Sequence, residues 1–101
     1  MALDFHRLDN SDFLFGLDDR QYNYLTEIFD KFTQWTGLVI DQYGHIKLTV
    51  ENQITLVKII EKYIDAIDLN KDKKKTSAIL EFKGLIKFFL IKKVDLELCG
   101  D

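Results

Sequence analysis

The two histidines and the single cysteine of this sequence, His6, His45 and Cys99, have the chemistry of a nucleophile, a base or a metal ligand. A thiol beside an imidazole can act as a nucleophile with its base, and histidine is a common metal ligand. The two histidines are far apart in the sequence and form no metal motif by spacing, although folding could bring them together. His45 follows a glycine, which is typical of a solvated turn, and a lone thiol on an alternating segment is more often a small apolar residue. We therefore predict no catalytic residue, no metal site and no cofactor.

The motifs that bind phosphates, dinucleotides or zinc are absent from the sequence, which contains no G-x-x-x-x-G-K, G-x-G-x-x-G, H-E-x-x-H or C-x-x-C. Acidic residues are plentiful, but no spacing among them indicates a pair tuned for acid–base catalysis. We therefore expect a protein that is not an enzyme.

Four lysines between residues 71 and 75 form a basic segment that could contact phosphate. Asp68 and Asp72 lie beside and within it, no aromatic residue interleaves it, and the chain as a whole is acidic. These features favour a solvated loop and no nucleic-acid partner.

The stretch Thr36–Thr49 is predicted to form a β-hairpin between two helices. Its strand-forming runs are residues 38–40 and 46–48, and Asp41 and Gly44 open and close the four residues between them. Asp at the start and Gly at the end of such a segment favour a type I turn.

The flanking segments have the spacing of amphipathic helices. Apolar residues that include Trp35 recur at three- and four-residue steps after Asp18, a predicted N-cap, and Gly37 is a predicted C-cap. Thr49 is predicted to cap a second helix that ends by Asp68.

A third helix is expected over residues 78–92, beginning at Thr76 or Ser77. It is apolar around most of its circumference, which predicts burial on more than one side, with Gly84 allowing close packing.

Alternating residues suggest an edge strand or an extended arm over 3–8 and predict a half-buried strand over 94–99, and the apolar run 13–17 fits a strand or a single turn. The terminal strand is expected to pair with the central hairpin. The predicted fold class is α+β: a small antiparallel or mixed sheet, made of the central hairpin and the terminal strand, packed with three helices.

The chain of 101 residues, of which 47% are hydrophobic, is expected to be one globular domain spanning residues 1–101. A single cysteine favours a reducing compartment, and no signal peptide is expected from the N-terminal residues. The most apolar segment, residues 79–91, is too short for a bilayer and is interrupted by charges, so we expect no membrane span and a cytoplasmic location.

The charge is unevenly distributed along the chain. Residues 1–57 hold nine acidic and four basic residues, a net charge of −5, whereas residues 58–101 hold eight acidic and ten basic residues, a net charge of +2. An acidic half without a nucleotide motif suggests a basic protein partner. Mild acidity that serves solubility alone is an equal alternative.

The central stretch also carries a resemblance. The pattern T-G-x-x-I-D-x-Y-G at residues 36–44, with a helix before it, two helices after it and a closing Gly100-Asp101, resembles small bacterial immunity proteins of polymorphic or contact-dependent growth-inhibition toxin systems. The resemblance implies a cytosolic antitoxin that binds one cognate toxin domain, often a basic nuclease, in a 1:1 complex and blocks its active site or substrate groove.

For this function the contact residues would be exposed acidic and aromatic side chains, since aromatic residues anchor interfaces and acids at the rim govern the association rate. The predicted toxin-binding residues are Asp19, Glu27, Asp30, Asp41, Tyr43 and Glu51. For Asp41 turn formation, and for Tyr43 packing over the sheet edge, are structural alternatives.

Two other functions stay open at this point. One is a nucleic-acid-binding accessory protein that uses the Lys71–Lys75 loop. The other is a non-catalytic adaptor or homodimer that exposes the edge of its sheet. The sequence leaves the oligomeric state open.

Overall fold

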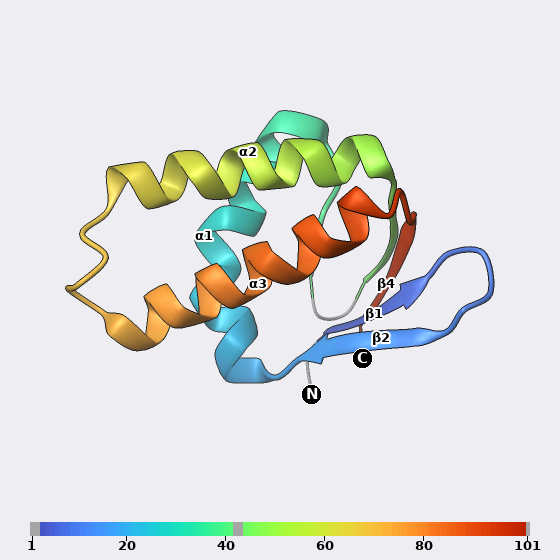
Figure 1. Ribbon diagram of the computed structural model, residues 1–101, viewed down its shortest axis with the longest axis horizontal. Helices are drawn as coiled ribbons and strands as arrows, with labels where there is room; N and C mark the ends of the chain where they lie inside the picture. Colours follow the sequence, from blue (N-terminus) through green and yellow to red (C-terminus); the bar gives the residue numbers. More distant parts are fainter. Residues whose placement is uncertain (1–2, 42–43, 101) are drawn as a thin grey trace.

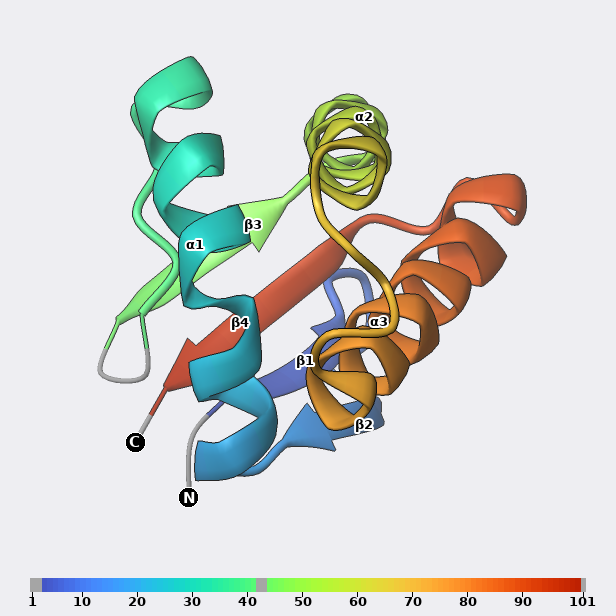
Figure 2. The same cartoon turned by 90° about the vertical axis from the view of Figure 1, so that its left-hand side faces the viewer.

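Three helices pack on one side of a four-stranded antiparallel sheet in the computed structural model of the protein, which describes residues 3–41 and 44–100 (Figure 1, Figure 2). The strands lie in the order β2-β1-β4-β3. Their bounds are β1 Leu3–Arg7, β2 Phe13–Leu17, β3 His45–Leu48 and β4 Leu96–Gly100. The predicted α+β class is confirmed.

The helices are α1 Asp19–Thr36, α2 Val50–Ala66 and α3 Lys73–Ile91. The predicted caps of the first two are confirmed. Asp18 and Gln21 form a capping box, and Gly37 ends α1 with a φ of 80°, in the left-handed region that glycine adopts without strain. The Thr49 hydroxyl accepts the backbone N–H of Asn52 at the start of α2.

The core lies between the helices and one face of the sheet. Alternate residues of the two central strands, Leu3 and Phe5 on β1 and Leu96 and Leu98 on β4, are almost completely buried. Phe82 of α3 contacts the ring of Phe5 edge-on, with centroids 5.7 Å apart. The residues between these buried positions point to the opposite face, which no helix covers.

The predicted central hairpin is wrong in its first arm. Residues 38–40 form no strand, and β3 pairs with β4 instead. The run is held by other contacts: the Leu38 N–H bonds the Thr36 hydroxyl, and the Tyr22 hydroxyl donates to the carbonyl of Ile40, which is buried. Gln42 and Tyr43 of the predicted turn lie outside the described residues.

The expected pairing of the terminal strand with residues 46–48 is confirmed: β4 lies between β3 and β1, and Leu98 is opposite Ile46 on one side and Phe5 on the other. The edge strand or extended arm expected at residues 3–8 is wrong, because β1 is a central strand between β2 and β4. The N-terminal segments form the antiparallel pair β1–β2, so residues 13–17 are a strand rather than a single turn.

Helix α3 differs from the prediction in both its start and its burial. It begins earlier than predicted, with Asp72 as N-cap accepting the N–H of Lys75, so part of the basic segment is helical. It is buried on one side only, because α1, α2 and the sheet all contact that side: Phe88 and Ile91 remain 53% and 78% exposed. A Cβ at Gly84 would meet no atom within 4 Å, so the predicted close packing at this glycine is wrong.

Within the described part of the chain, none of the helices has the length and apolar character that crossing a membrane requires.

Candidate functional site

The predicted toxin-binding residues occupy three elements. Asp19, Glu27 and Asp30 are exposed along α1, and their spacings of eight and three residues place them within one side of the helix. Asp41 is half-buried in the segment before β3, and Glu51 is exposed in the first turn of α2. Tyr43 lies outside the described residues. The structure therefore brings together the three acids of α1 and places Asp41 and Glu51 on other elements.

Glu27 has a structural partner that the sequence analysis missed. Its carboxylate accepts a 3.0 Å hydrogen bond from the hydroxyl of Tyr63 on α2 and forms a 3.4 Å ion pair with Lys75 of α3. The Tyr63 hydrogen bond and then the charge of Lys75 hold the pKa of Glu27 below its ordinary value. This carboxylate links all three helices.

Trp35, predicted from its spacing to belong to the apolar face of α1, is 53% exposed. Lys62 of α2 places its ammonium 4.9 Å from the centre of the ring, a cation–π contact. Beside the ring, α1 and α2 enclose a hollow of about 240 Å³ that Ile59, Tyr63 and other residues line. A half-exposed tryptophan next to a hollow is a typical anchor for a binding partner.

The basic segment is divided by these contacts. Lys71, Lys73 and Lys74 are exposed beside a hollow of about 570 Å³ at the α2–α3 connection. Lys75 is used within the molecule, since it pairs with Glu27 and lies 5.4 Å from the ring centre of Tyr63.

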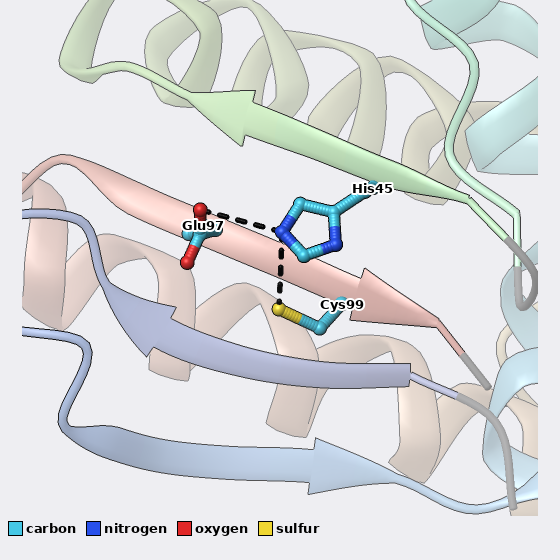
Figure 3. Close-up of side chains that lie close together, drawn as sticks. All are labelled: His45, Glu97 and Cys99. Atoms are coloured by element: carbon cyan, nitrogen blue, oxygen red, sulfur yellow. Dashed lines mark hydrogen bonds and ion pairs between the residues drawn. The ribbon is translucent and has the colours of Figure 1, made fainter.

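A second group of functional side chains gathers on the open face of the sheet. His45 of β3 is directly opposite Cys99 of β4, and Glu97 is two residues before Cys99 and therefore on the same face. Figure 3 shows the three side chains in front of the strands, with the helices behind. Their ligand atoms all lie within 4.8 Å of one another, and they are the one such group of three found in residues 3–41 and 44–100.

The contacts within this cluster converge on one atom. The Nε2 of His45 lies 3.6 Å from the Sγ of Cys99 and 3.3 Å from a carboxylate oxygen of Glu97 (Figure 3). The side chain of His45 is 64% exposed and that of Glu97 is 24% exposed, so solvent reaches the cluster. Partial burial, followed by the negative charges of Glu97 and Asp4, raises the pKa of the Cys99 thiol.

This geometry does not fit a nucleophile with its base. In a catalytic triad the thiol contacts one ring nitrogen and the carboxylate orients the other, whereas here both contact Nε2. A reactive cysteine also has a lowered pKa, and that of Cys99 is raised. What the three atoms can do together is surround a shared cation.

From the sequence, Cys99 could pair with His6 or His45, and Glu97 was not among the candidate residues. Alternation alone places Glu97 and Cys99 on one face of the terminal strand. The register that sets His45 opposite Cys99 depends on which strands pair, and the sequence pattern does not specify it.

Comparison of the chain with protein-family models, with curated proteins and with solved structures finds no match in any of the three.

Proposed function

We propose that this protein is an immunity protein that binds a cognate bacterial toxin domain of the nuclease class and covers its active site or substrate groove. The observation that carries the proposal is the exposed acidic side of α1, formed by Asp19, Glu27 and Asp30, within the half of the chain that has a net charge of −5. A nuclease domain that holds nucleic acid is basic, so an acidic surface attracts it and competes with its substrate.

Trp35 supplies the anchor of the proposed contact. It lies near the C-terminal end of the same helix, half exposed beside the hollow between α1 and α2. Tryptophan is enriched among the few residues that contribute most of the binding energy of an interface, while surrounding acids mainly accelerate association. Asp41, Tyr43 and Glu51 complete the proposed contact residues.

The protein acts by binding and carries out no reaction of its own. One copy occupies one toxin domain in the cytoplasm, where a nuclease toxin would meet the nucleic acid of the cell. Inhibition then requires only that the complex be tight and that it form before the toxin finds its substrate.

The test is co-expression with the toxin domain encoded by the neighbouring open reading frame. The chain should rescue growth of cells that express this toxin and should co-purify with it in a 1:1 complex. Absence of both rescue and complex overturns the proposal. A stable homodimer without a partner, seen by sedimentation at several concentrations, would favour the adaptor alternative.

Four variants locate the contact surface. Trp35→Ala and the double variant Asp19→Asn/Asp30→Asn should weaken the complex, whereas Asp65→Asn, which removes an exposed acid of α2, should not. Weakening only by Phe88→Ser, on the exposed side of α3, would move the contact to that helix while leaving the function in place.

The exposed Lys71, Lys73 and Lys74 beside their hollow favour a second candidate, a nucleic-acid-binding accessory protein. Its support is weaker because Lys75 is paired with Glu27. A gel shift that weakens with salt and disappears when the lysines are replaced by glutamine would favour it over toxin binding.

A further inference from the structure

We propose that His45, Glu97 and Cys99 form a zinc site on the open face of the sheet. The three residues supply one imidazole nitrogen, one carboxylate oxygen and one thiolate sulfur, each an established ligand of Zn²⁺. This site goes beyond the proposed binding of a toxin and does not depend on it.

Two of the three distances within the cluster match edges of a zinc tetrahedron. Bonds of about 2.3 Å to sulfur and about 2.0–2.1 Å to nitrogen and oxygen place the sulfur about 3.6 Å from the nitrogen, and the nitrogen about 3.3 Å from the oxygen. The Sγ–Nε2 and Nε2–Oε2 distances in the protein are 3.6 Å and 3.3 Å. The third pair of atoms, the sulfur and a carboxylate oxygen, lies within 4.8 Å, so an ion can sit between the three atoms after a small movement of the side chains.

The backbone holds this arrangement in place. His45 and Cys99 are a directly opposed pair on two hydrogen-bonded strands, and Glu97 lies on the same strand as Cys99. Ligands on adjacent strands of a sheet are held more rigidly than ligands on loops. The Gly100 N–H also bonds the carbonyl of Gly44 at 2.8 Å, which ties together the chain on either side of the pair.

The local charges favour a cation with one nearby exception. Asp4 of β1 is opposite Cys99, so its carboxylate adds a negative charge beside that of Glu97. The same negative potential attracts a metal ion. Lys47 of β3 is opposite Glu97 and competes with the ion for this carboxylate.

The ligand set selects the kind of metal. Thiolate and imidazole prefer Zn²⁺ and similar transition metals, whereas Mg²⁺ and Ca²⁺ require oxygen ligands. Three protein ligands leave the fourth position of a tetrahedron to water, and the exposure of His45 keeps this position open to solvent.

Cobalt titration under reducing conditions tests the site, because Co²⁺ replaces Zn²⁺ and a thiolate bound to it absorbs in the near ultraviolet. The wild-type chain should bind one Co²⁺ with this absorption, and Zn²⁺ should displace it. Cys99→Ser should abolish the absorption and lower the affinity for Zn²⁺ at least about 100-fold, because loss of even an indirect partner costs about 10–100-fold. His45→Gln should also lower the affinity by at least about 100-fold.

The matched control is His6→Gln. His6 is the other histidine of the open face, opposite Glu97 on β1, but its Nδ1 contacts the carbonyl of Ser11. This variant should bind Co²⁺ and Zn²⁺ as the wild type does. Equal loss in His6→Gln and His45→Gln would overturn the assigned ligands.

Thermal unfolding gives a second measurement without a spectroscopic probe. Zn²⁺ at about 100 times the wild-type dissociation constant should raise the melting temperature of the wild type by roughly 10 °C and that of Cys99→Ser by no more than about 2 °C. Circular dichroism without metal should be the same for all variants, since these side chains lie on the open face. A wild type with no thiolate absorption, with one Co²⁺ per two chains, or with the zinc affinity of Cys99→Ser would overturn the site.

Discussion

At the scale of single residues, Gln53 is the one fully buried polar side chain of the described ranges 3–41 and 44–100. Its amide nitrogen donates to the carbonyls of Leu48, at 3.0 Å, and Val94, at 2.7 Å. These carbonyls lie at the end of β3 and just before β4, so one side chain on α2 holds both strands against the helix. Its Oε1 atom has no hydrogen-bond partner among these described residues.

Replacing Gln53 with methionine should lower the free energy of unfolding by about 2 kcal/mol. The two carbonyls lose their donor inside the core, and each unsatisfied group costs about 1–3 kcal/mol, while loss of the unpaired Oε1 returns part of this. Urea unfolding measures the change, and Gln34→Met on the exposed side of α1 is the control. Equal stability of wild type and Gln53→Met would mean that the burden of the unpaired oxygen cancels both hydrogen bonds.

Glu27 is largely exposed, yet its lowered pKa makes the free energy of unfolding depend on pH. The folded state binds this proton less readily than the unfolded chain does, so the contacts with Tyr63 and Lys75 stabilise the fold above the ordinary pKa of 4.5. The contribution is lost as the pH falls through the lowered pKa of the folded state.

We therefore expect the difference in stability between wild type and Glu27→Gln to be constant near neutral pH and to shrink below pH 4.5. Denaturant unfolding at several pH values measures it. Tyr63→Phe removes the first cause of the shift and should show a similar pH dependence, with little further change in the double variant. A difference that stays constant down to pH 3, on the order of one pH unit below the ordinary value, would contradict this.

At the scale of the elements, two glycines predict opposite effects of the same substitution. Gly84→Ala should raise the free energy of unfolding by about 1 kcal/mol, because the position is helical and open. Gly37→Ala should lower it by about 1–2 kcal/mol, because the φ of 80° at the end of α1 disfavours a side chain. Thermal unfolding of both variants checks the pair, and a destabilising Gly84→Ala would show that another surface packs against α3.

The elements that could be predicted from the sequence are those that local contacts determine. Helix starts are set by local hydrogen bonds, so Asp18 and Thr49 could be identified as N-caps without knowledge of the fold. The strand predicted at residues 38–40 was wrong because strand formation depends on a partner. The second neighbour of β4 is β1, which is distant in the sequence. The predicted burial of α3 on more than one side was wrong for a related reason, since an apolar helix is buried only where other elements cover it.

In the candidate site too, residues placed by local spacing could be predicted and residues placed by strand pairing could not. The three acids of α1 could be predicted because helical spacing alone places them on one exposed side. The cluster of His45, Glu97 and Cys99 could not, because residues 54 positions apart meet only through the register of β3 against β4. The exposure of Trp35 was also out of reach, since its spacing fits the buried stripe and only the position of α2 leaves it open.

At the scale of the whole molecule, the net charge of −5 in residues 1–57 includes the acids of α1, while residues 58–101 carry +2. This division is along the sequence; in space, the acids of α1 form one exposed side that a net charge of −3 does not reveal. For a basic toxin domain, the acids of α1 should act mainly on the rate of association. Exposed charges attract the partner before contact, but they remain solvated in the complex and contribute little to its stability.

Stopped-flow association with the toxin domain tests this separation of roles. Asp19→Asn/Asp30→Asn should lower the association rate constant by roughly 3- to 10-fold at low salt and leave the dissociation rate nearly unchanged, whereas Trp35→Ala should mainly accelerate dissociation. In 1 M salt, where the screening length falls to about 3 Å, the charge variant and the wild type should associate at similar rates. The control Asp65→Asn removes one negative charge at an exposed site on α2 and should behave nearly as the wild type. If the two charge variants slow association equally for each charge removed, total charge rather than the acidic side of α1 guides the encounter, and the contact surface must be placed elsewhere.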